Sequence, residues 1–229
     1  MTNQRVLVVT AHPDDPEFHF GATIASLVSD GAVVSYVICS DGVQGGSDLT
    51  VTDVKVAAIR SAEQRAAAAV LGVREVTFLG CRDGQLAPTI GLRRMITSQL
   101  RRQRPSLVLT HYPRRILDIP LEASHPDHLA VGEATLAALY PDVSNPRAFP
   151  ELLGEGLAAH HVGEVWMPGY ERPNHYVDAT PYLDRKIEAI CCHRSQLADG
   201  PPEWIYGWMR EAGRKPGYEY AEHFLRIVI

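Results

Sequence analysis

The 229-residue chain is predicted to adopt an α/β fold: a Rossmann-like, doubly wound, mostly parallel sheet with a C-terminal extension that forms a cleft. Two observations predict this fold. Short runs of β-branched residues alternate with longer stretches whose apolar residues recur at helical spacing. Glycine or proline also stands where predicted helices end, at Gly31, Gly72 and Pro105. The length suits a single domain over residues 1–229, with a Rossmann-like core at 1–140 and an extension at 141–229.

The core alternates predicted strands and helices, whereas the extension is less regular. The core strands are buried β-branched runs at Val6–Val9, Val33–Ile38, Val76–Leu79 and Leu107–Leu109. The core helices are predicted at Ala22–Ser29, Val54–Leu71, Leu92–Arg102 and Leu129–Leu139. In the extension we expect an irregular segment at 141–163, strands at Glu164–Met167 and His175–Asp178, and a helix at Tyr182–Cys192. No element is predicted for residues 195–229.

Composition and charge exclude several kinds of partner. The net charge of −5 and the absence of a basic stripe argue against nucleic acid, and the cluster Arg101, Arg102 and Arg104 is expected to be the solvated end of a helix. No apolar run approaches the ~18 residues of a membrane span, and the N-terminus does not resemble a signal peptide. The cysteines lack metal-site spacing and are expected to be reduced core residues. We therefore expect a cytoplasmic protein; a homo-oligomer is compatible with the sequence.

The first predicted strand leads directly into the motif Ala11-His12-Pro13-Asp14-Asp15-Pro16-Glu17. This motif places an imidazole and three carboxylates at the carboxyl end of a strand, where a doubly wound sheet binds its ligands. Proline favours extended backbone at the residue before it, so we expect an open, extended loop at His12 and Asp15. A stiff loop of this kind suits metal ligands.

The second motif is Ser124-His125-Pro126-Asp127-His128, directly before a predicted helix. Pro126 fits the first helical position, so His125 and His128 should lie across the first turn and face the same way. The positive end of the helix dipole disfavours the imidazolium form, and neutral imidazole is the form that binds a metal.

Together the motifs predict a catalytic metal site. Two histidines and one carboxylate leave coordination positions open for water and substrate. Of the adjacent Asp14 and Asp15, one can ligate the metal while the other takes a proton from water, and Asp14 is the expected proton acceptor. Either motif alone is compatible with a turn before a capped helix, but the pair favours chemistry.

In these motifs the sequence resembles the PIG-L/LmbE family of zinc-dependent N-acetylglucosaminyl deacetylases. The resemblance rests on the two motifs and extends through Arg60-Ser61-Ala62-Glu63, Leu71-Gly72, Phe78-Leu79 and Asp83-Gly84. Three C-terminal runs, at 172–178, 193–196 and 217–222, look most like the branch that includes archaeal diacetylchitobiose deacetylases. The resemblance implies hydrolysis of the acetamide of an N-acetylglucosamine-type sugar or glycoconjugate, which releases acetate and a free amine.

The resemblance also implies a role for each site residue. Zn²⁺, or Fe²⁺ or another divalent ion in its place, would bind His12, Asp15 and His128, and activate the water that attacks the amide. Asp14 would be the general base. His125 would polarise the carbonyl group and protonate the leaving amine, and Asp127 would hold the His125 ring in orientation. Arg60 and Asp83 match positions that contact sugar hydroxyls in relatives.

Some residues depart from the family pattern or fall outside it. Ala123 stands where one branch carries a tyrosine that assists the oxyanion, and the loop Asp41–Gly46 replaces a Gly-Glu turn, so substrate choice is expected to differ. His111 is a candidate to line the cleft, whereas His19 is expected to have a packing or surface role. His193 is expected either to line the pocket or to be a hydrogen-bonded core residue.

Two alternatives remain at this stage. Metal-activated water does not select its acyl donor, so the chain could deacylate a non-sugar amide or an ester in natural-product biosynthesis. A Rossmann-type module that binds a nucleotide or a metal without catalysis is the non-enzyme alternative. The first strand-to-helix turn lacks G-x-G-x-x-G and carries acidic residues that would repel a pyrophosphate, which disfavours nucleotide binding.

Overall fold

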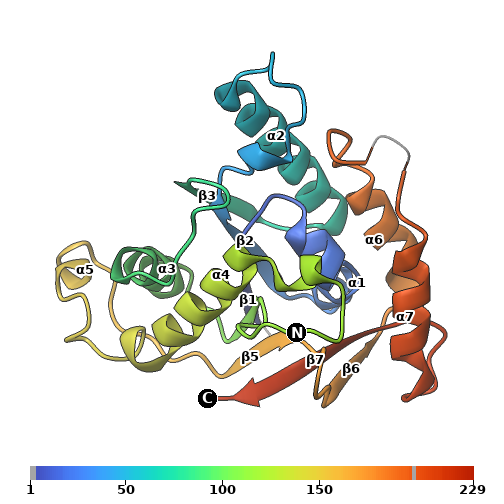
Figure 1. The fold of residues 1–229 in the computed structure, drawn as a ribbon. Coiled ribbons are helices and arrows are strands. Elements are labelled where there is room, and N and C mark those ends of the chain that lie inside the picture. Colours follow the sequence, from blue (N-terminus) through green and yellow to red (C-terminus); the bar gives the residue numbers. More distant parts are fainter. Residues whose placement is uncertain (1–3, 198–199) are drawn as a thin grey trace.

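One mixed sheet organises the chain, for which the computed structural model describes residues 4–197 and 200–229. Its seven strands lie in the order β3-β2-β1-β4-β5-β7-β6 (Figure 1). Their bounds are Arg5–Thr10 (β1), Val33–Ser40 (β2), Glu75–Cys81 (β3), Leu107–Thr110 (β4), Glu164–Pro168 (β5), His175–Asp178 (β6) and Ala221–Val228 (β7). Strands β1 to β5 are parallel, whereas β7 runs antiparallel to both β5 and β6. The predicted mostly parallel α/β fold is confirmed, and the extension contributes three strands to the same sheet.

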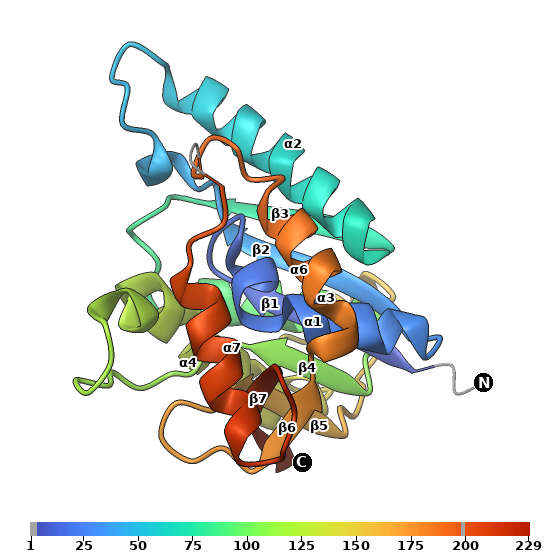
Figure 2. The same ribbon diagram turned by 90° about the vertical axis from the view of Figure 1, so that its right-hand side faces the viewer.

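Helices cover both faces of the sheet (Figures 1 and 2). Their bounds are Asp15–Ser29 (α1), Asp53–Leu71 (α2), Ile90–Gln103 (α3), Pro126–Ala137 (α4), Glu151–Gly154 (α5), Leu183–Ile190 (α6) and Trp204–Arg214 (α7). One core cluster joins α1, α2 and α6 to the sheet, and another joins α3 and α4 to the opposite face. No helix within the described ranges has the length and apolarity that a bilayer crossing requires.

The alternation of side chains along β1 explains the two cores. Val6 and Val8 pack with Phe20 and Ile24 of α1, whereas Leu7 and Val9 point to the α3 and α4 side. Successive side chains of a strand point to opposite faces, so a central strand covered on both sides must be apolar at every position. The run Val6–Val9 meets this requirement.

The strand order creates a switch point beside β1. The chain moves outward from β1 to β2 and β3 and then returns through α3 to β4, on the other side of β1. The loops that follow β1 and β4 therefore leave the sheet side by side and in opposite directions. In such sheets this crevice is where ligands bind. It brings the two sequence motifs together.

Helix α1 begins earlier than predicted. It starts at Asp15, not at Ala22, so the expectation of an extended loop through Asp15 was wrong. Pro16 lies in the first helical turn, where its missing N–H leaves no hydrogen bond unmade. The bend between strand and helix falls on Asp14 alone, whose φ is 109°.

Two elements of the extension, α7 and β7, were not predicted. The α7 sequence Trp-Ile-Tyr-Gly-Trp contains residues of weak helix propensity, so the local sequence does not predict a helix. Its stability comes from packing, because Ile205 and Met209 insert among Ala22, Ile190 and other core residues. The second half of β7 is exposed, so its sequence lacks the apolar pattern of a buried strand.

The predicted solvated arginine cluster is only partly solvated. Arg101 is 2% exposed, and its Nη2 donates to the carbonyl oxygens of Asp142, Asn145 and Ala148 at 2.8–2.9 Å. One guanidinium thus organises the turn that follows α4. The cysteines are free, as expected, but only Cys39 is fully buried.

Two helical glycines provide a matched test of how closely α4 packs on the end of β4. A Cβ on Gly132 would lie 2.6 Å from the carbonyl oxygen of His111, whereas a Cβ on Gly207 in α7 would meet nothing within 4 Å. We expect Gly132→Ala to lower the free energy of unfolding by about 1–3 kcal/mol through overpacking. Gly207→Ala should raise it by about 0.4–1 kcal/mol. Urea unfolding measures both, and equal effects would contradict the close α4 contact.

Candidate functional site

The two motifs meet at the carboxyl ends of β1 and β4. His12 lies on the short loop after β1, Asp15 is the first residue of α1, and His128 lies in the first turn of α4. Pro126 occupies the start of α4, as predicted. The fold therefore brings together, from two loops far apart in sequence, the residues expected to bind a metal.

Three of these side chains form a triangle of potential ligand atoms. His12 Nδ1 lies 3.2 Å from His128 Nε2 and 3.4 Å from Asp15 Oδ2, and His128 Nε2 lies 3.0 Å from Asp15 Oδ1. Ligand atoms that surround a tetrahedral zinc ion at 2.0–2.1 Å are about 3.3 Å from one another. The spacing of this triangle fits a small divalent cation.

The second nitrogen of His12 faces two buried carboxylates. Nε2 lies 3.1 Å from Asp83 Oδ1 and 3.2 Å from Asp127 Oδ2. An ionised carboxylate can accept hydrogen bonds but cannot donate one, so His12 Nε2 carries the hydrogen and donates it. The lone pair is then on Nδ1, which faces Asp15 and His128. Paired carboxylates of this kind fix the tautomer of a metal-binding histidine.

The expected partner of Asp127 needs correction. Its carboxylate accepts hydrogen bonds from the backbone N–H groups of Gly84 (2.8 Å) and Leu86 (3.1 Å), as well as contacting His12. The contact with His125 is made by the Asp127 backbone N–H, which donates to His125 Nδ1 at 3.1 Å. The Asp127 side chain thus orients His12, while its backbone orients His125.

Besides this triangle, three other groups among the described residues bring possible ligand atoms within 4.8 Å of one another: His12, His125 and His128; His19, His111 and His128; and His12, Asp83 and Asp127. The last group is the hydrogen-bonded set just described. The second is poorly suited to a shared ion, because the His111 and His128 rings stack at 4.0 Å with an angle of 8° between planes. An ion in the plane of one ring would lie well outside the plane of the other.

The site has an electrostatic field that favours positive charge. Burial lowers the pKa of His12, but the carboxylates of Asp15, Asp127 and Asp83 outweigh burial and raise it to about 12. Burial raises the pKa of Asp15, yet His128, His111 and His12 together hold it well below its usual value. Asp15 is therefore ionised, and the same field that favours a proton on His12 attracts a metal cation.

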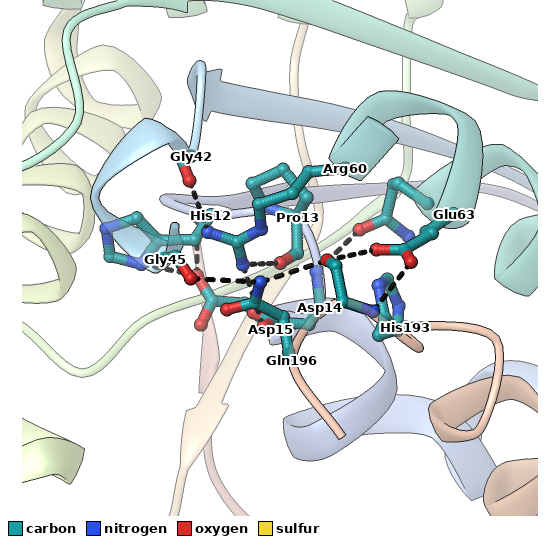
Figure 3. A network of polar contacts seen from close by, with 12 residues as sticks. His12, Pro13, Asp14, Asp15, Gly42, Gly45, Arg60, Glu63, His193 and Gln196 are labelled. Carbon is teal, nitrogen blue, oxygen red and sulfur yellow. Dashed lines mark hydrogen bonds and ion pairs between the residues drawn. The ribbon is translucent and has the colours of Figure 1, made fainter. Parts of the chain in front are cut away.

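Asp14 is held beside this triangle by a buried arginine (Figure 3). Arg60 Nη2 donates to Asp14 Oδ2 at 2.9 Å and to the Pro13 carbonyl oxygen at 2.6 Å, and Nη1 donates to the Gly42 carbonyl oxygen at 2.6 Å. Burial raises the pKa of Asp14 to about 6, although the charge of Arg60 acts to lower it. A carboxylate with a pKa near the working pH is suited to accept and release a proton.

A buried network supports the strained backbone of Asp14, and it was not predicted. The Asp14 N–H donates to Gln64 Oε1 at 2.8 Å, and Gln64 Nε2 donates to both carboxylate oxygens of Glu17 at 3.0 Å. His193 Nε2 lies 3.1 Å from Glu17 Oε2, so His193 is a hydrogen-bonded core residue. The spacing of Arg60 and Gln64 could have indicated that both face Asp14, since residues four apart on a helix share a face.

His125 is half-buried and caps the start of α4. Its Nδ1 accepts the Asp127 N–H, so in the neutral ring Nε2 carries the hydrogen. Burial lowers the pKa of His125, and the neighbouring His12 and His128 lower it further. A neutral ring with an Nε2–H group can donate a hydrogen bond to a carbonyl oxygen that gains negative charge.

His111 lies at the triangle, in keeping with its prediction as a cleft residue, and His19 lies closer to it than expected. His111 Nε2 lies 3.1 Å from Asp15 Oδ2 and 3.0 Å from the Ala11 backbone nitrogen, which donates to it. The His19 ring lies 5.7 Å from that of His128 and 5.3 Å from that of His111, edge to face. His19 follows Asp15 by four residues, so the helical pattern from Asp15 onward would have placed it on the same face.

The two residues expected to contact a sugar make contacts within the protein. Arg60 and Asp83 are 4% and 3% exposed. Asp83 Oδ2 accepts the backbone N–H of Gln44 at 2.9 Å, and Asp83 Oδ1 faces His12. The loop that differs from the family pattern therefore supports these residues, through the Gly42 carbonyl group and the Gln44 N–H group. A sugar-binding role for either residue stays a prediction.

Known proteins resemble this chain along most of its length. The profile of the PIG-L family, described as GlcNAc-PI de-N-acetylase, matches residues 7–139. Diacetylchitobiose deacetylase of Thermococcus kodakarensis is 30% identical over 227 residues, covering 96% of this chain and 81% of that protein. Probable N-acetyl-alpha-D-glucosaminyl L-malate deacetylase 2 of Bacillus anthracis is 33% identical over 204 residues, covering 86% of this chain and 84% of that protein. The structure of N,N′-diacetylchitobiose deacetylase from Pyrococcus horikoshii in complex with its inhibitor MPG superposes with a TM-score of 0.89 at 29% identity, covering 98% of this chain and 84% of that one. With a profile match over more than half of its residues and a 30% identical relative aligned over 96% of it, this chain belongs to the PIG-L family.

Proposed function

We propose that the protein is a metal-dependent hydrolase that removes the acetyl group from an N-acetylglucosamine-type sugar or glycoconjugate. The observation that carries the proposal is the triangle of His12, Asp15 and His128, with Asp14 held beside it by Arg60. The named relatives deacetylate N-acetylglucosamine-containing compounds, which supports this substrate class.

His12, Asp15 and His128 would hold the metal ion through His12 Nδ1, an Asp15 carboxylate oxygen and His128 Nε2. Two neutral imidazoles and one carboxylate suit zinc, and also Fe²⁺ or another borderline divalent ion. When bound, the ion supplies Lewis acidity that polarises the amide carbonyl group and makes a water molecule easier to deprotonate.

Asp14 and His125 would handle the proton and the developing charge. Asp14 takes a proton from the attacking water, and with a pKa of about 6 it can release that proton to the departing nitrogen. The His125 Nε2–H group donates to the carbonyl oxygen as negative charge grows there. This division favours His125 as an oxyanion stabiliser, because its lowered pKa disfavours the imidazolium that an acid would need.

Acetate release from candidate substrates tests the proposed function. Purified protein with added Zn²⁺, Fe²⁺ or Co²⁺ would be incubated with N-acetylglucosamine, N,N′-diacetylchitobiose and N-acetylglucosaminyl malate. A simple acetate ester and an N-acetyl amino acid serve as control substrates, and metal-free protein as the control enzyme. Cleavage of the control substrates without cleavage of any sugar would show that the proposed substrate class is wrong.

We predict that the purified protein binds about one equivalent of divalent metal and that His128→Ala loses it, because two remaining ligands hold such an ion weakly. His125→Ala is the matched control: it removes an imidazole three residues earlier, at the N-cap of the same helix, and should retain the metal if His125 is not a ligand. Elemental analysis of the three proteins after gel filtration measures this. Metal retained equally by both variants would exclude His128 as a ligand.

We predict opposite defects for the adjacent aspartates. Asp14→Asn should keep the metal and lose roughly 10²- to 10⁴-fold in kcat, since the proton acceptor is gone. Asp15→Asn should weaken metal binding, and excess metal should restore part of its activity. Metal titrations and steady-state kinetics on both variants separate the roles. Loss of metal from Asp14→Asn and its retention in Asp15→Asn would reverse the assignment.

Arg60→Ala tests which role that arginine has. Because its guanidinium is buried and binds Asp14, we expect the variant to lower kcat more than it raises KM, with metal content unchanged. A thermal melt checks that the fold survives. A raised KM at unchanged kcat would instead support the direct sugar contact that the family resemblance implies.

A further inference from the structure

An aromatic surface lies beside the candidate metal site, and its residues lie outside the two histidine motifs. Two of the three tryptophans of the chain, Trp204 and Trp208, are one turn apart on α7 and are 55% and 44% exposed. Trp204 stacks on Phe18 at 5.9 Å and meets Trp208 edge to face at 5.7 Å, and Trp208 lies 5.9 Å from Tyr170. We call Phe18, Tyr170, Trp204 and Trp208 the aromatic shelf.

The aromatic shelf is continuous with the metal site. Phe18 lies on α1 three residues after Asp15, so it is a little less than one helical turn, about 4.5 Å, along the same helix. At the other end of the shelf the Tyr170 hydroxyl group lies 3.5 Å from His19 Nδ1, and the His19 ring lies against that of His128. A ligand whose acetamide is at the metal site and which extends toward α7 would therefore meet the shelf.

A cavity of about 60 Å³ opens at the foot of the shelf, lined by Phe18, His19, Tyr170, Trp208 and Met209 among others. This is about the volume of two water molecules, too small for a sugar ring but sufficient for a hydroxyl or hydroxymethyl substituent. Lys186 and Glu222 also border it, but they pair with each other at 2.6 Å. The Tyr170 hydroxyl group, His19 and His223 remain as polar groups at the wall.

We propose that the aromatic shelf binds a second pyranose ring, so that the substrate is a saccharide of at least two rings with the N-acetylated ring at the metal site. This inference rests on the proposed function. The C–H groups of a pyranose face carry partial positive charge and are attracted to the negative face of an indole ring. Exposed tryptophans are unusual on a surface without a ligand or partner, and this pair flanks a cavity with polar walls.

The test compares a disaccharide with a monosaccharide in matched variants. Trp204→Ala and Trp208→Ala should each lower the ratio of kcat/KM for N,N′-diacetylchitobiose to kcat/KM for N-acetylglucosamine by roughly tenfold, the effect of one lost stacking contact. Trp208→Phe should restore most of the ratio because it keeps an aromatic face. Leu153→Ala is the control: Leu153 is 43% exposed and lies on α5, on the opposite side of the molecule from α7 (Figure 1), and the ratio should not change.

A binding measurement keeps this inference separate from the proposed function. Tryptophan fluorescence of the metal-free protein should shift on titration with N,N′-diacetylchitobiose, and the shift should be much smaller in Trp208→Ala. If the sugar binds in this way but no acetate is released from any sugar by the metal-loaded enzyme, the proposed function fails and the shelf stands. If both substrates change equally in the variants, or the sugar causes no shift, the shelf does not bind saccharide. A wild-type dimer that Trp208→Ala converts to monomer in light scattering would show instead that a second copy covers the shelf.

Discussion

His12 holds its ring between two sets of partners, and the geometry of the site depends on this placement. On one side, Asp83 and Asp127 accept a hydrogen bond from Nε2; on the other, Nδ1 faces Asp15 and His128. If the ring turned over, the lone pair would face two carboxylates and the triangle would lose a corner. Asp83 and Asp127 are themselves fixed by backbone N–H groups, which ties the ring to the loops around it.

A second constraint acts on Asp14, whose positive φ is unfavourable for a residue with a side chain. Such a conformation persists only where its surroundings determine it. Here Arg60 and Gln64, both from α2, bind the carboxylate, the backbone N–H group and the preceding carbonyl group. The same bend lets Asp14 and Asp15 point in different directions, which is what two adjacent carboxylates need in order to have different roles.

Much of this architecture could be predicted from the sequence, because it is encoded locally. Buried parallel strands appear in the sequence as runs of β-branched residues, and Pro126, two residues before His128, marks the start of α4. The contacts that could not be predicted are long-range. Nothing near Asp127 in sequence indicates that its carboxylate would bind His12 instead of His125, and nothing near Arg101 indicates three carbonyl partners about forty positions later. Helix α7 was missed for a related reason, since tertiary packing stabilises a segment of weak intrinsic propensity.

The strand order at the end of the sheet has a consequence for how the chain is made. Strand β6 precedes β7 in the sequence, but β7 lies between β5 and β6 and pairs with both. During synthesis, β6 thus has no place in the sheet until residues 221–228 have left the ribosome, and the free edge of β5 stays open meanwhile. Open edges of parallel sheets are sites of mispairing between chains. The final insertion of β7 closes this edge and anchors β6, so the outer part of the sheet is assembled out of sequence order, after the core that carries the metal-site residues can already have formed.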